Sequence, residues 1–121
     1  MEQDQAVKVF QSLASGLRLD IYRLLVKHAP QGLVAGDIGT TLELPPTNLS
    51  FHLKALSQAG LLTVVQEGRY QRYRARMTLV QELIGYLTDE CCAGHPEQCA
   101  DLRAGSACGN RESASSDAEK I

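Results

Sequence analysis

Two short helical patterns separated by a pair of prolines constrain the fold of this chain more than any other feature. Apolar residues recur at helical spacing over residues 34–42 and over residues 47–58, with Pro45-Pro46 between them and Gly60 after the second stretch. They are Val34, Ile38 and Leu42 in the first stretch and Leu49, Leu53 and Leu56 in the second. Two short helices around a tight turn, the second ending at glycine, are typical of a helix-turn-helix.

The rest of the chain predicts three more helices and a hairpin. Apolar periodicity favours helices over residues 6–14, 17–28 and 78–90, with Ser15 as the expected N-cap of the second. Residues 61–67 and 69–77 alternate as strands do, with Gly68 as the turn between them. The expected fold is therefore mainly α with one small two-stranded hairpin.

Composition points to an aliphatic core and an uneven charge. The chain has 121 residues, two Phe and no Trp, so its core must consist of aliphatic side chains, and a core this small favours a homodimer. Residues 47–78 carry five basic residues and one acidic residue, a net charge of +4, whereas residues 80–121 carry −5. A basic middle between acidic ends predicts one local anionic partner.

The outer face of the second short helix carries polar and aromatic side chains near its start. These are Thr47, Asn48, Ser50, Phe51 and Lys54. A helix in the DNA major groove reads bases from such positions, because Asn pairs with adenine, Ser and Thr bind bases or phosphates, and Phe contacts a thymine methyl group. His52 lies among the inward-facing leucines, so we expect it to pack and hydrogen-bond rather than to carry chemistry.

These motifs resemble the arsenical-resistance repressor (ArsR/SmtB) family of metal-responsive winged-helix dimers. The matching segments are Leu13-Ala14-Ser15-Gly16-Leu17-Arg18-Leu19, Ser50-Phe51-His52-Leu53-Lys54-Ala55-Leu56, Ala59-Gly60-Leu61-Leu62, Glu67-Gly68-Arg69-Tyr70 and Tyr73-Arg74. The resemblance implies a winged helix-turn-helix of about five helices with a two-stranded β wing. It also implies a homodimer, formed through the first and last helices, on double-stranded operator DNA. Arg69, Arg72 and Arg74 of the wing would then hold phosphates or the minor groove.

The sequence departs from this family at its usual effector sites. The family's arsenic-sensing cysteines form a Cys-Val-Cys-Asp-Leu-Cys run at the start of the third helix, whereas the matching stretch here, residues 34–39, has no cysteine. The family's zinc site uses Asp and His along the last helix, and residues 78–90 show no counterpart. The resemblance alone therefore does not identify the effector.

All four cysteines follow the last predicted helix. Cys91 and Cys92 are adjacent, with Cα atoms ~3.8 Å apart, which is too close for an ordinary disulfide but suits the sharing of one soft ion. Gly94 and Pro96 allow the intervening loop to bring Cys99 back to the pair. Three thiolates suit As(III) or Sb(III), one per subunit, with no organic cofactor. Some arsenic repressors that resemble this chain carry such a pair and a third cysteine.

Other interpretations of the cysteines remain open. His95 or Cys108 as a fourth ligand would give a tetrahedral zinc or cadmium site. Cys99 paired with Cys92 or Cys108 would make a redox switch, and the cysteines could also be idle, above all Cys108. An enzyme is not expected, because no cysteine is followed six positions later by the arginine that a thiol arsenate reductase would need.

The chain predicts a domain and a tail. Residues 1–90 form the expected DNA-binding and dimerisation domain, and residues 91–121, poor in large aliphatic side chains, form a flexible tail with the thiol site. The polar N-terminus and the lack of an 18-residue apolar run predict a cytoplasmic protein that avoids membranes. Its cysteines would stay reduced there.

Overall fold

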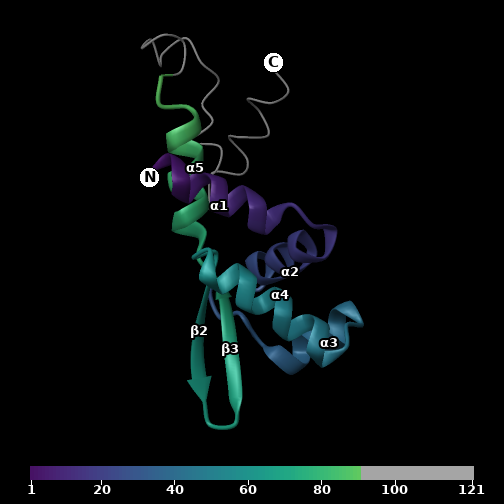
Figure 1. Cartoon of the computed structure of the whole chain (residues 1–121). Coiled ribbons are helices and arrows are strands. Elements are labelled where there is room, and N and C mark those ends of the chain that lie inside the picture. Colours follow the sequence, from purple (N-terminus) through teal and green to yellow (C-terminus); the bar gives the residue numbers. More distant parts are fainter. Residues whose placement is uncertain (91–121) are drawn as a thin grey trace, which may run out of the picture. The chain divides into compact units, whose positions relative to one another are not determined.

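The structure, a computed structural model, describes residues 1–90 (Figure 1). Residues Met1–Leu79 form one compact unit, and α5 continues from it into the second. In chain order the elements are α1 (Gln3–Leu13), α2 (Gly16–Lys27), β1 (Leu33–Val34), α3 (Ala35–Leu42), α4 (Pro46–Gln58), β2 (Leu62–Glu67), β3 (Tyr70–Ala75) and α5 (Met77–Leu87). The five expected helices and the hairpin are confirmed.

The core of the first unit is aliphatic, as the composition predicts, except for the ring of Tyr22. Its buried side chains come from every helix of the unit and from the start of β2. They are Ala6, Val9, Ile21, Tyr22, Leu25, Ile38, Leu49, Leu53, Leu56, Leu61, Leu62 and Leu79. Helix α4 contributes three of these leucines, so its inner face packs in the core and its outer face points away from the core.

The sheet has a third strand that the sequence did not predict. β1 pairs antiparallel with β3 on the side away from β2, with Leu33 opposite Tyr73 and Val34 opposite Arg72. Residue 34 therefore belongs to a strand and caps α3, whereas the sequence placed it inside that helix. Gly32 makes this pairing feasible: its φ is +73°, and a Cβ there would collide with the carbonyl oxygen of Tyr73.

Most helix boundaries differ from the sequence predictions by one to three residues, and two of the differences have a clear physical reason. α4 begins at Pro46 rather than Thr47, because proline suits the first helical turn, where its missing N–H would have no partner. α5 ends at Leu87 rather than Glu90. The Thr88 hydroxyl donates to the carbonyl of Ile84 at 2.7 Å, and two acidic residues follow, which the negative end of a helix dipole disfavours.

The wing is the hairpin of β2 and β3, which extends away from the helices in Figure 1. Gly68, with φ +62°, and Arg69 form its two-residue turn, so β3 starts at Tyr70 instead of Arg69. Within residues 1–90, no helix is both long and apolar enough to cross a bilayer.

Candidate DNA-binding surface

The outer face of α4 presents every side chain that the sequence assigned to DNA reading. Thr47, Asn48, Ser50, Phe51 and Lys54 are all exposed, whereas Leu49, Leu53 and Leu56 are buried. Phe51 is 65% exposed, the largest exposed fraction among the large apolar side chains of the described residues. An aromatic ring held in water beside polar side chains suits contact with a second molecule.

The start of α4 leaves backbone donors free. Pro45 occupies the N-cap position and makes no side-chain capping bond, and Pro46 carries no N–H. The amide groups of Thr47 and Asn48 lie in the first helical turn, where no carbonyl within the helix can accept them. Phosphate oxygens are suitable acceptors for such groups, and the positive end of the helix dipole favours them.

His52 takes part in a contact between α2 and α4. The Nε of Arg18 donates to Nδ1 of His52 at 3.1 Å, which gives His52 the hydrogen-bonding role expected from the sequence. The Arg18 guanidinium also lies 5.7 Å from the centre of the Phe51 ring. The Phe51 and His52 rings meet edge to face, with centres 5.5 Å apart. The Phe51 ring therefore contacts two neighbouring side chains, Arg18 and His52.

The three wing arginines have different surroundings. Arg69 is exposed at the turn, whereas Arg72 and Arg74 are partly buried on one face of β3. The Nε of Arg72 donates to both carboxylate oxygens of Glu67, and one terminal nitrogen donates to the carbonyl of Gly32 at 3.4 Å. Arg72 thus joins the wing to the loop before β1, while Arg69 and Arg74 have no carboxylate within 4 Å in the part of the chain that the structure describes.

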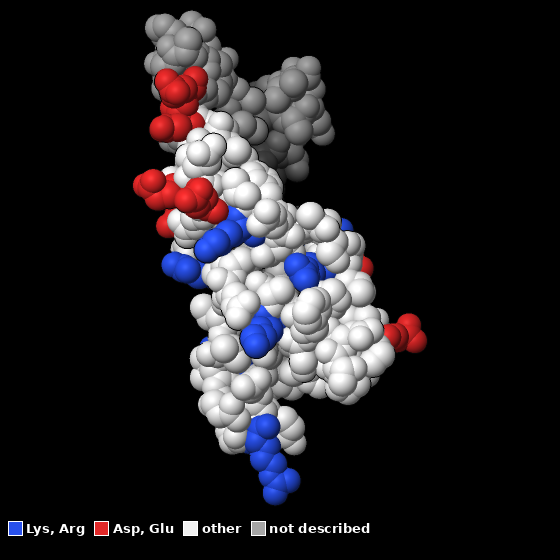
Figure 2. Space-filling view, in the orientation of Figure 1, with Lys and Arg blue, Asp and Glu red and all other residues white. Residues whose placement is uncertain are grey.

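Basic side chains lie on the surface of the wing and of the helices beside it. Figure 2 shows them as separate blue groups along one face, including one at the wing tip. Tyr73 lies on the opposite face of β3 from Arg72, and its hydroxyl donates to the Gln71 side chain at 3.1 Å. Burial raises the pKa of the Tyr73 phenol above its ordinary value.

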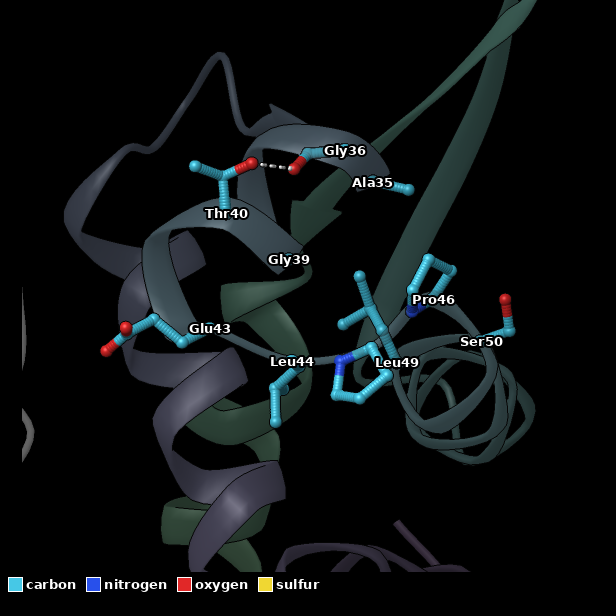
Figure 3. Close-up of a pocket in the computed structure, with 10 residues that line it drawn as sticks. Ala35, Gly36, Gly39, Thr40, Glu43, Leu44, Pro46, Leu49 and Ser50 are labelled. Atoms are coloured by element: carbon cyan, nitrogen blue, oxygen red, sulfur yellow. Dashed lines mark hydrogen bonds between the residues drawn. The ribbon is translucent and has the colours of Figure 1, made fainter.

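A hollow of about 550 Å³ lies between α3 and the start of α4 (Figure 3). Small side chains of α3 form one wall, and Leu49 and Ser50 of α4 form another. Besides Leu49 and Ser50, the residues that line the hollow are Ala35, Gly36, Gly39, Thr40, Glu43, Leu44, Pro45 and Pro46. The lining is mostly apolar. The Thr40 hydroxyl donates a hydrogen bond to the carbonyl of Gly36.

Within residues 1–90, no three His, Cys, Asp or Glu side chains are close enough together to hold a metal ion. The predicted thiol ligands Cys91, Cys92 and Cys99 lie outside the described residues, as do His95 and Cys108.

Three residues of this surface were missed by the sequence analysis: Arg18, Glu67 and Gly32. Glu67 could have been found, because a hairpin turning at residues 68–69 places it diagonally across from Arg72. Arg18 and His52 are 34 residues apart, and no sequence pattern joins them.

Comparison with known proteins agrees with this fold. A helix-turn-helix domain family, HTH_20, matches residues 13–65. HlyU from Vibrio cholerae is 30% identical, over 76% of this chain and 99% of that one, with a TM-score of 0.59. An ArsR-like transcriptional regulator from Rhodococcus is 26% identical, over 78% of this chain and 92% of that one, with a TM-score of 0.60.

A third relative is the winged helix-turn-helix DNA-binding domain Mb0332 from Mycobacterium bovis, described as homodimeric and as a possible ArsR-family regulator. It is 30% identical, over 72% of this chain and 81% of that one, with a TM-score of 0.59. No curated protein matches the chain. Since two relatives that are 30% identical are matched over most of their length, the chain belongs to the ArsR family of winged helix-turn-helix, DNA-binding transcriptional regulators.

Proposed function

We propose that the protein is a homodimeric repressor that leaves its operator when Cys91, Cys92 and Cys99 of a subunit bind As(III) or Sb(III). The observation that carries the proposal is the placement of the thiols: every cysteine follows residue 90. At the start of α3, where the family's usual arsenic-sensing cysteines lie, this chain has Val34, Gly36 and Gly39 at the three cysteine positions. A thiol sensor in this chain must therefore be built after α5.

In this proposal, α4 reads the operator and the wing holds the backbone. Asn48, Ser50 and Phe51 set the base preference, and Thr47 supports them at the helix start. Lys54, Arg69, Arg72 and Arg74 bind mainly phosphates. The exposure of all five α4 side chains supports the first assignment, and the positive charge of the wing supports the second. A regulator of this kind carries out no chemical reaction on its ligand.

The homodimer is proposed from two separate surfaces. On α1, Val7 and Phe10 are 45% and 48% exposed, and on α5, Tyr86 and Leu87 are 38% and 59% exposed. The Mycobacterium bovis relative is described as homodimeric, which supports a dimer here. Two copies of α4 would then meet successive major grooves ~34–36 Å apart on a two-fold symmetric site.

An ion bound at Cys91 acts where α5 ends, because only Thr88, Asp89 and Glu90 separate Leu87 from that thiol. If α5 forms part of the dimer contact, a change there alters the spacing of two α4 helices that must fit one duplex together. Coupling of this kind between effector and DNA weakens binding about 5–150-fold in ordinary cases.

Two alternatives of the same fold use the same cysteines. A zinc or cadmium sensor would add His95 or Cys108 as a fourth ligand. A redox sensor would form a disulfide from Cys99, releasing DNA on oxidation and rebinding on reduction.

Parallel titrations separate the three functions. Reduced full-length protein is bound to its own promoter DNA, and arsenite, antimonite, cadmium and zinc are each added while binding is followed by fluorescence anisotropy. The proposal expects arsenite and antimonite to release DNA at the lowest concentrations. Release by zinc or cadmium alone selects the tetrahedral site, and release only by an oxidant such as diamide, reversed by dithiothreitol, selects the redox switch.

A further inference from the structure

The first turn of α2 carries a positive charge that its own helix does not favour. Arg18 is the third residue of α2, close to the positive end of the helix dipole, where a cation is unfavourable. Among residues 1–90, no carboxylate lies within 4 Å of it. Its side chain is directed to α4 instead, where it contacts His52 and Phe51.

We propose that Arg18 is a positioning residue for DNA reading: from α2, it fixes the direction in which Phe51 projects from α4 and thereby sets the base preference at the position that Phe51 contacts. The inference rests on the DNA-reading role proposed above for Phe51.

The geometry gives Phe51 two lateral supports. The Arg18 guanidinium is 5.7 Å from the ring centre, within the range of a cation–π contact. The His52 ring touches Phe51 edge to face at 5.5 Å. The hydrogen bond of 3.1 Å from Arg18 Nε to His52 Nδ1 holds these two supports to each other. A ring that is 65% exposed would otherwise be free to change rotamer, and ordering it would oppose DNA binding.

Charge alone cannot provide this support. The hydrogen bond to His52 uses Nε, where the guanidinium group joins the side-chain stem, while Cζ at the centre of the same group lies 5.7 Å from the centre of the Phe51 ring. Lysine has a single terminal ammonium and can satisfy one of the two contacts at a time. Arg18→Lys therefore keeps the positive charge near the DNA and removes the positioning.

The test compares base preference with overall affinity. Wild type, Arg18→Lys, Phe51→Ala and the double variant each select binding sites from a library of random duplexes. Binding constants are then measured on the preferred site and on that site with the Phe51-dependent base pair changed. Arg23→Lys is the matched control, since Arg23 is exposed on the same helix. Thermal unfolding checks that each variant is folded.

We expect Arg18→Lys to bind the preferred site within about threefold of wild type but to lose about fivefold or more in discrimination at that base pair, the lower end of what one base contact provides. The double variant should discriminate no worse than Phe51→Ala, because Arg18 acts through that ring. Equal selectivity of Arg18→Lys and Arg23→Lys, or additive losses in the double variant, would overturn the proposal.

Variants of His52 provide a second route if Arg18→Lys is unstable. Asparagine offers a side-chain oxygen near the position of Nδ1, so His52→Asn should keep more discrimination than His52→Leu, which offers no acceptor. Equal discrimination by these two variants contradicts the proposal. If the wild-type protein selects no sequence, the proposed DNA reading itself is overturned. If the wild type is selective and neither Arg18→Lys nor His52→Leu loses discrimination, only the role of Arg18 is overturned.

Discussion

Arg72 holds Glu67 across the wing hairpin, with its Nε 2.9 and 3.0 Å from the two carboxylate oxygens. The side chains of the pair are 28% and 42% exposed, so the pair adds little stability, about 0–1 kcal/mol. A DNA phosphate can therefore compete with Glu67 for Arg72. Glu67 therefore lowers the net positive charge of the wing.

Glu67→Gln should strengthen binding to the operator and to unrelated duplexes alike. It removes one negative charge and frees Arg72, which should make the plot of log binding constant against log salt steeper by about one unit if Arg72 then neutralises one phosphate. Anisotropy titrations at several salt concentrations measure this. The double variant with Arg72→Gln is the control and should lose the added steepness; an unchanged slope in Glu67→Gln would show that Glu67 does not compete with phosphate for Arg72.

Arg74 and Phe51 should have separable effects. Arg74→Ala should weaken all sequences equally and reduce the salt slope by about one unit, because a phosphate contact carries no base information. Phe51→Ala should instead change which bases are preferred. Site selection and salt titration on both variants provide the comparison, and losses of affinity without any change in preference in both would refute the assignment.

Gly32→Ala should destabilise the domain by about 2 kcal/mol or more. The φ of +73° disfavours any L side chain, and the added methyl would meet the carbonyl oxygen of Tyr73 and the stem of Arg74. Urea denaturation measures the loss in free energy of unfolding. Gly36→Ala is the matched control, since no atom lies within 4 Å of its added Cβ, and should stabilise α3 by up to about 1 kcal/mol. Equal effects of the two changes would contradict the close approach at Gly32.

Tyr22 should make the fold sensitive to alkali. Burial raises the pKa of the Tyr22 phenol above its ordinary value, and the phenol of the unfolded chain titrates near about 10. The stability linked to this group is therefore present below pH ~10 and is lost as the pH rises above that value. Tyr22→Phe should lose less stability than wild type between neutral pH and pH ~11. Tyr70→Phe, at an exposed wing position, serves as the control and should follow wild type.

Periodicity and turn residues were sufficient to predict the helices and the hairpin, because leucines at positions 49, 53 and 56 fix both the helix and its buried face. They were not sufficient for β1, whose two residues form a strand only because β3 offers a partner. The sequence pattern places Pro46 between the two short helices, whereas in the structure it begins the second, because proline suits the first helical turn. The contact of Arg18 with His52 depends on the packing of α2 against α4, which no local pattern contains.

The proposed effector site lies beyond residue 90, where all four cysteines of the chain are found. Its chemistry requires thiolates, so ion capture should release protons and should depend on each of three cysteines. Serine at any of those positions removes one ligand while leaving α4 and the wing intact.

The most direct measurement is arsenite titration of DNA-bound wild type, Cys99→Ser and Cys108→Ser, followed by anisotropy under reducing conditions. All three proteins should bind the operator equally well without arsenite. Wild type and Cys108→Ser should dissociate at similar arsenite concentrations, and Cys99→Ser should remain bound. Dissociation of Cys99→Ser at the wild-type concentration would contradict the three-thiol site and leave a two-thiol or inter-subunit site in its place.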